Sequence, residues 1–207
     1  MRRPYPVIAS PRTGDPMSTE ISAYSRNYVA RRGMFFGREF RLFGPEGNLR
    51  FFVKQKAFKL KEEITVFGDE KQSDAILGIQ ARGIGDFSGT YDVSDKKSGE
   101  KVGALKREGL KSMIRDEWTI LDTAGAPMGK VQEESGGMAL LRRFLPIIPQ
   151  SFKVWVGDKE VGSIKQRFNP FQVVYDVDLE AAGGHLDPRV GVAAVVLLLA
   201  IEGRQGK

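Results

Sequence analysis

The 207-residue chain contains no cysteine and a single histidine, His185. The absence of cysteine excludes disulfides, thiolate metal sites and a cysteine nucleophile, and it suits a reducing compartment. A lone histidine excludes a zinc site built from several histidines and removes most nucleophile–base pairs. The glycine-rich segment Gly83-Ile-Gly85 does not qualify as a phosphate-binding loop, because no helical pattern follows it. We therefore expect a protein that is not an enzyme and that carries no cofactor, apart from a weak calcium site considered below.

Most of the chain also carries nearly equal numbers of basic and acidic residues. The formal net charge is +6, and residues 1–33 hold six arginines against Asp15 and Glu20, which gives +4. The rest of the chain has 26 basic and 24 acidic residues, which gives +2. Nucleic-acid-binding proteins usually carry their basic bias on the folded domain, so we expect no nucleic-acid partner. Met1-Arg-Arg is not followed by the apolar run of a signal peptide, which favours a cytoplasmic protein.

A short strand-like pattern recurs six times along the chain. The six copies end at residues spaced 24, 26, 26, 26 and 33 apart, namely Arg32, Lys56, Arg82, Glu108, Glu134 and Arg167. A second strand-like run lies between successive copies, and turn residues such as Gly44-Pro-Glu-Gly47 end it. The repeating unit is therefore a β-hairpin, and the period predicts twelve strands. They follow a flexible, basic, proline-containing arm at residues 1–26, so that the folded domain spans residues 27–207.

The last element is an unusually apolar helix. Asp187-Pro188 has the residues preferred at the N-cap and the first helical position, and Val190 to Ile201 contains no polar side chain. Twelve helical residues rise only about 18 Å, against about 30 Å of bilayer hydrocarbon. A helix that is apolar on every face must be enclosed by protein or lipid, and here protein fits better. We predict a mainly β fold: a twelve-stranded closed β-barrel of six hairpins around a central hydrophobic C-terminal α-helix.

Several short motifs together resemble a known family. They are Val53-Lys-Gln-Lys-Ala-Phe58, Val66-Phe-Gly-Asp69, the segment from Trp155 to Arg167, and Asp187-Pro-Arg189. Their order and spacing resemble the tubby C-terminal-like barrel superfamily, and within it the LURP-one-related and phospholipid scramblase-related proteins. The resemblance covers roughly residues 27–203. The chain departs from animal scramblases in having no cysteine, hence no palmitoylation cluster.

The resemblance implies a non-enzymatic barrel protein that associates with lipid or a membrane surface. Tubby-type relatives bind phosphoinositide head groups, scramblase-type relatives are associated with calcium-dependent lipid movement, and many LURP-one-related members have no established biochemistry. The expected partner is anionic membrane lipid, and the expected location is cytoplasmic, peripheral at the inner face of the cytoplasmic membrane. The alternative is a soluble scaffold or regulatory domain that binds proteins and no lipid.

Two groups of basic residues are candidates for lipid contact. Strand alternation predicts a basic patch on the barrel exterior that comprises Lys54, Lys56, Lys106, Lys165 and Arg167. The alternative is an ordinary solvated exterior balanced by Glu108, Glu133 and Glu134. A second candidate is Arg142-Arg143, inside the apolar insertion from Met138 to Pro149, which resembles a membrane-surface element. Its alternative is a plug over the barrel mouth with two solvated arginines.

A calcium site is suggested by Asp176, Asp178, Glu180 and Asp187, which lie where the resemblance places the calcium segment of scramblases. Their spacing also imitates a helix–loop–helix calcium loop, but Ala181 replaces the required turn glycine. Asp176 and Asp178 share one strand face and are expected to chelate calcium weakly at best. The alternative is a set of surface carboxylates, with Asp187 as the helix cap. Trp118 and Trp155 are both expected in the core.

Overall fold

The computed structural model describes residues 24, 26–33, 39–54, 63–83, 89–108, 117–134 and 149–201. The helical elements are η2 (Glu180–His185) and α3 (Pro188–Ile201). The strands are β1 (Asn27–Gly33), β2 (Glu39–Phe43), β3 (Leu49–Lys54), β4 (Ile64–Phe67), β5 (Ala75–Ala81), β6 (Thr90–Asp95), β7 (Lys101–Arg107), β8 (Glu117–Leu121), β9 (Pro127–Glu133), β10 (Ser151–Val156), β11 (Lys159–Arg167) and β12 (Gln172–Asp178).

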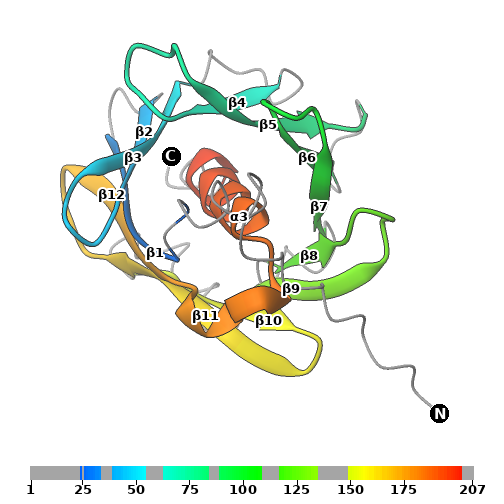
Figure 1. The fold of residues 1–207 in the computed structure, drawn as a ribbon. Coiled ribbons are helices and arrows are strands. Elements are labelled where there is room, and N and C mark those ends of the chain that lie inside the picture. The colour runs from blue at the N-terminus through cyan, green and yellow to red at the C-terminus, as the bar shows by residue number, and fades with distance from the viewer. Residues whose placement is uncertain are drawn as a thin grey trace.

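The strands form a closed barrel in which each strand pairs with the next one along the chain. The ring is closed by β1 and β12, which pair antiparallel in continuous register from Asn27 opposite Asp178 to Gly33 opposite Gln172. Figure 1 shows the ring of strands with α3 at its centre. The predicted twelve-stranded barrel is confirmed, and closure leaves the described strands without an unpaired sheet edge.

Alternation of side chains explains why these segments are strands. In β2, Phe40 and Leu42 are fully buried in the barrel, whereas Glu39 and Arg41 lie on the outer face and form an ion pair there. In β8, Trp118 and Ile120 point inward in the same way. Each strand therefore has one apolar face for the interior and one polar face for solvent.

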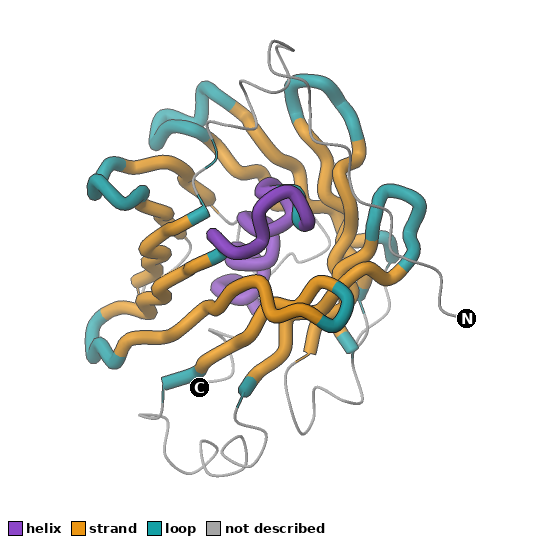
Figure 2. The backbone as a smooth tube through the Cα atoms, turned by 60° about the horizontal axis from the view of Figure 1, so that its bottom comes forward, coloured by secondary structure: helices purple, strands orange, loops and turns teal. Residues whose placement is uncertain are grey.

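The central position of α3 is confirmed. All fourteen of its residues are buried, which suits a helix without a polar face, and Figure 2 shows the strands enclosing it. Asp187 caps its first turn, because the carboxylate accepts a hydrogen bond of 2.9 Å from the Arg189 amide. Near its last turn, Arg32 of β1 donates a hydrogen bond of 2.8 Å to the carbonyl of Leu199. No helix in the described ranges is long and apolar enough to cross a bilayer.

Small residues allow the helix to lie close to its surroundings. A Cβ added at Gly191 of α3 would lie 2.7 Å from a methyl group of Leu179, and one added at Gly103 of β7 would lie 3.0 Å from Val190. Both separations are shorter than a carbon–carbon contact, so these glycines mark where helix and barrel meet most closely.

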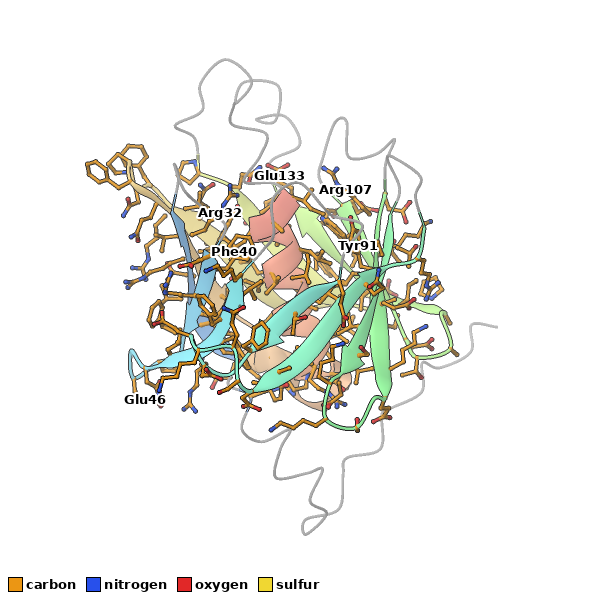
Figure 3. All side chains as sticks on the ribbon, turned by 90° about the horizontal axis from the view of Figure 1, so that it is seen from above. Arg32, Phe40, Glu46, Tyr91, Arg107 and Glu133 are labelled. Carbon is orange, nitrogen blue, oxygen red and sulfur yellow. The ribbon has the colours of Figure 1, made fainter. Side chains whose placement is uncertain are left out.

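Two contacts of β1 and its preceding residue show how the strands run relative to α3. Arg26, just before β1, accepts a backbone hydrogen bond from Leu179 near the start of α3, whereas Arg32 reaches the carbonyl of Leu199 near its end. Odd-numbered strands therefore run toward the C-terminal end of α3, and the connection between β11 and β12 lies at that end. In Figure 3, Arg32, Arg107 and Glu133 lie around that end, and Glu46 lies at the opposite one.

Candidate functional site

The predicted basic patch on the exterior does not form as one surface. Lys54 lies on β3, Lys106 on β7, and Lys165 and Arg167 on β11. These strands stand four apart in the ring of twelve, so each lies about a third of the circumference from the next. The prediction that they form one patch is wrong. Equivalent positions in successive hairpins lie on different strands, so the closed barrel distributes them around its circumference. The other candidates, Lys56, Arg142 and Arg143, lie outside the described residues.

The two isolated lysines are each paired with a neighbouring carboxylate. Lys54 Nζ lies 3.4 Å from an oxygen of Glu39, and Lys106 Nζ lies 3.2 Å from an oxygen of Glu108. Side chains in these pairs are partly exposed, so the pairs contribute little to stability. These pairs fit the alternative interpretation, a solvated exterior on which carboxylates balance the lysines.

The seam that closes the barrel brings a different set of cations together. Arg167 of β11 and Arg31 of β1 both lie opposite Val174 of β12 in register, and Arg31 lies opposite Arg41 of β2. Lys165 lies beside them, opposite Asp176. We call Arg31, Arg41, Lys165 and Arg167 the basic wall. Val174 is only 6% exposed although it lies on the outer face between two arginines.

The cations of the basic wall differ in their partners. Arg41 Nε lies 2.6 Å from an oxygen of Glu70, and this hydrogen bond raises the pKa of Arg41 above its ordinary value. Arg167 forms a two-pronged pair with Asp176, which raises the pKa of Arg167. The Arg31 guanidinium lies 4.9 Å from the centre of the Phe43 ring.

Two cations of the wall are not committed to a carboxylate. Within the part of the chain that the structure describes, neither Arg31 nor Lys165 has an ion-pair partner. Both side chains are exposed. An arginine and a lysine in this position present charge and hydrogen-bond donors to an external anion.

A shallow groove of about 410 Å³ runs along the same seam. Lys165, Asp176, Asp178, Ser163 and Asn27 line it, and its rim includes the turn between β2 and β3. The groove offers one ammonium group, two carboxylates, a hydroxyl and an amide. This mixture suits a small polar group that carries both charges better than it suits a simple anion.

The calcium candidates are arranged only in part as expected. Asp176 and Asp178 do share the outer face of β12, but Asp176 is held by Arg167. Asp178 accepts a hydrogen bond of 3.1 Å from the amide of Glu180, and Asp187 caps α3. Among the described residues, no three His, Asp or Glu side chains are gathered as a metal site would require. Calcium binding at Asp176 and Asp178 stays a prediction.

Two residues lie on faces other than those expected from the sequence. Glu133 was assigned to the exterior, but it points into the barrel and is 1% exposed. It follows Val131 at the two-residue spacing of an inward strand face, and that spacing was the available signal. Trp118 is buried as expected, whereas Trp155 lies on the outer face with Lys130 Nζ 5.9 Å from its ring.

Comparisons with known proteins give a family and one similar structure. The sequence matches the family described as LURP-one-related over residues 49–199. The search of curated proteins found no match. The crystal structure of a protein from Arabidopsis thaliana is similar to this chain, with 13% sequence identity and a TM-score of 0.49. The similarity covers 89% of this chain and 96% of that protein.

Proposed function

Because the chain belongs to the LURP-one-related family, we propose that it is a binding protein for anionic membrane surfaces, and that the basic wall contacts the lipid head groups. The proposal rests first on the likeness of this family to lipid-associated barrels. It rests equally on the outer surface of the seam between β11, β12 and β1, where the cations of the basic wall lie.

The observation that carries the proposal is the pair of uncommitted cations, Arg31 and Lys165. Most cations on the exterior already face a carboxylate, as Lys54 and Lys106 do, so their charge is largely neutralised nearby. Arg31 instead lies between two other arginines in register, Arg41 and Arg167. Arg41 and Arg167 are paired with carboxylates, so Arg31 and Lys165 supply the charge of the basic wall that is available to an anionic surface.

The expected binding is electrostatic and weak. Each lysine or arginine near an anionic leaflet contributes about 1 kcal/mol, and the attraction fades over a Debye length of about 8–10 Å. Removing the two uncommitted cations should therefore cost about 2 kcal/mol, which corresponds to an affinity about thirtyfold lower. Stability should fall by no more than about 1 kcal/mol. Both side chains are exposed, neither has an ion-pair partner among the described residues, and an exposed cation–π contact such as that of Arg31 with Phe43 contributes about 0.5–1 kcal/mol.

Vesicle co-sedimentation tests the proposal. The vesicles contain phosphatidylcholine alone, phosphatidylcholine with phosphatidylserine, or phosphatidylcholine with a phosphoinositide, each at low and high salt. We expect salt-sensitive pelleting with the two anionic compositions and about thirtyfold weaker binding of Arg31→Gln/Lys165→Gln. The matched control is Lys54→Gln/Lys106→Gln, which removes the same charge elsewhere on the barrel and should change the affinity by less than about threefold.

A third variant tests the other candidate from the sequence. Arg142→Gln/Arg143→Gln removes two charges from a segment outside the described residues. If only this variant loses binding, the contact lies there and the basic wall is not the site. Failure of the unaltered protein to pellet with any anionic vesicle at low salt would overturn the proposal and favour the soluble scaffold.

A further inference from the structure

Two phenylalanines project from the end of the β11–β12 hairpin, which carries Lys165 and Arg167 of the basic wall. Phe168 is 65% exposed and Phe171 is 74% exposed, and these are the exposed large hydrophobic side chains of the described residues. Both belong to the four-residue connection between β11 and β12, which we call the aromatic tip. An exposed aromatic ring is costly in water, and two on one turn are unusual.

Hydrogen bonds hold the aromatic tip in its shape. The side-chain oxygen of Asn169 accepts bonds of 2.9 Å from the amides of both Phe171 and Gln172, and Pro170 restricts the backbone between them. A turn fixed in this way keeps its rings away from the barrel wall. The exposure is therefore a property of the folded hairpin.

The hairpin residues next to the tip are tied to Gln150, which directly precedes the neighbouring strand β10. The amide of Gln166 donates a bond of 2.7 Å to the carbonyl of Gln150, whose own amide donates to the Gln166 side chain at 3.0 Å. The Tyr175 hydroxyl donates to the Gln150 side chain at 3.1 Å. The hairpin is anchored from both of its strands, so it presents the rings on a rigid support.

The size and surroundings of the tip indicate what covers it. A phenylalanine has about 150–250 Å² of surface, so the exposed parts of the two rings amount to about 280 Å². A stable protein interface needs about 800 Å² on each partner, usually with an apolar centre. Among the described residues, the chain neighbours of the tip, Arg167 and Gln172, are polar and exposed. This narrow apolar wedge is too small for a protein interface but fits between lipid head groups.

The charges lie at the height that a membrane would require. Arg167 directly precedes Phe168, and Arg31 lies opposite Val174 at the level of Arg167. Lys165 is one step further from the tip on the same face, about 7 Å along the strand. An apolar element that lies about 5–10 Å deep at the boundary of head groups and acyl chains would place these cations beside lipid phosphates.

We infer that the aromatic tip inserts Phe168 and Phe171 into an anionic bilayer while Arg31, Lys165 and Arg167 contact its phosphates. The inference rests on the proposed function and deepens it, since it assigns the docking element, its orientation and an apolar component of the affinity. The barrel then meets the membrane with the end at which α3 terminates. The groove along the seam lies further along the same wall, away from the tip.

The absence of cysteine allows a direct test. A single environment-sensitive fluorophore is attached at Pro170→Cys, which keeps both rings, or at Pro45→Cys, a matched exposed proline in the turn between β2 and β3 at the other end. With vesicles of phosphatidylcholine and phosphatidylserine we expect a blue shift and at least threefold brighter emission at position 170 and neither change at position 45. A spin-labelled lipid should quench only the first probe.

Affinity measurements complete the test. Phe168→Ala/Phe171→Ala should weaken vesicle binding at least tenfold with an unchanged melting temperature, and the residual binding should remain salt-sensitive. If this variant binds as the unaltered protein does and the probe at position 170 stays in water, the inference is wrong and the proposed electrostatic function stands. If the unaltered protein binds no anionic vesicle, both fail. Self-association without lipid that depends on the two rings would also overturn the inference, because the tip would then be a contact between copies.

Discussion

Arg189, at the start of α3, donates a hydrogen bond of 3.0 Å to the carboxylate of Asp95 at the end of β6. Both side chains are at most 10% exposed, and 94 residues separate them in the sequence. Arg189 also pairs with Asp187 at 2.7 Å. A positive charge at a helix N-terminus opposes the helix dipole, so the two carboxylates offset an otherwise unfavourable position. The Arg189–Asp95 pair therefore fixes the start of the central helix relative to strand β6 of the barrel.

Replacing Arg189 by methionine should therefore be strongly destabilising. Asp95 would keep its bonds from the amides of Lys97 and Ser98 but would remain buried without its cation. Breaking a buried pair in this way costs about 3–5 kcal/mol. The matched control is Arg167→Met, which breaks an exposed pair and should cost less than about 1 kcal/mol. Urea unfolding measures both, and equal losses would show that the buried pair has no special role.

The stability should also fall in acid through Asp95. Burial by itself raises the pKa of Asp95, but the hydrogen bonds from the Ser98 amide and from Arg189 outweigh it and hold the pKa below its ordinary value. A lowered folded-state pKa stabilises the fold above the unfolded value of about 3.9, and this contribution is lost as the pH falls toward the folded value. Between pH 5 and pH 3, Asp95→Asn should lose less stability than the unaltered protein. Thermal melts at both pH values measure the difference, and parallel losses would contradict the assignment.

The architecture was predictable because two features of the sequence permit few solutions. The repeat of hairpins specifies alternating strands, and an apolar helix too short to span a bilayer needs enclosure on all sides, which a closed barrel supplies. The helix cap at Asp187 was also predictable, since capping is local chemistry that the neighbouring residues decide.

The site was less predictable because position around a ring is not local. Lys54, Lys106 and Lys165 occupy similar places in their repeats, and that similarity is what separates them around the barrel. Arg31 and Arg167 lie on either side of Val174 only because the first and last strands pair, and no local sequence pattern predicts that pairing. The aromatic tip did carry a signal, because rings at both ends of an Asn-Pro turn have no inward face to occupy.

The central helix should tolerate no charge. Leu198 is 1% exposed, and Leu198→Asp would bury an unpaired carboxylate at a cost of several kcal/mol against a total stability of about 5–15 kcal/mol. We expect an aggregating protein without a cooperative melt, and the same after truncation before Val190. The matched control is Phe171→Asp on the exposed tip, which should melt normally. A truncated chain that still melts cooperatively as a soluble domain would contradict the role of α3 as the core.

Calcium should bind with an affinity no better than about millimolar, because Asp176 and Asp178 lack the turn glycine and the bidentate glutamate of strong loops. The guanidinium of Arg167 also competes for Asp176. Arg167→Gln should release that carboxylate and strengthen calcium binding severalfold, whereas Asp178→Asn should abolish what binding there is. Lys153→Gln is the matched control, since it removes a cation from the adjacent strand β10 that pairs with Glu160 and not with these aspartates. Titration calorimetry distinguishes the cases: micromolar binding that is lost in Asp178→Asn would mean that the two carboxylates form a dedicated calcium site despite the arginine.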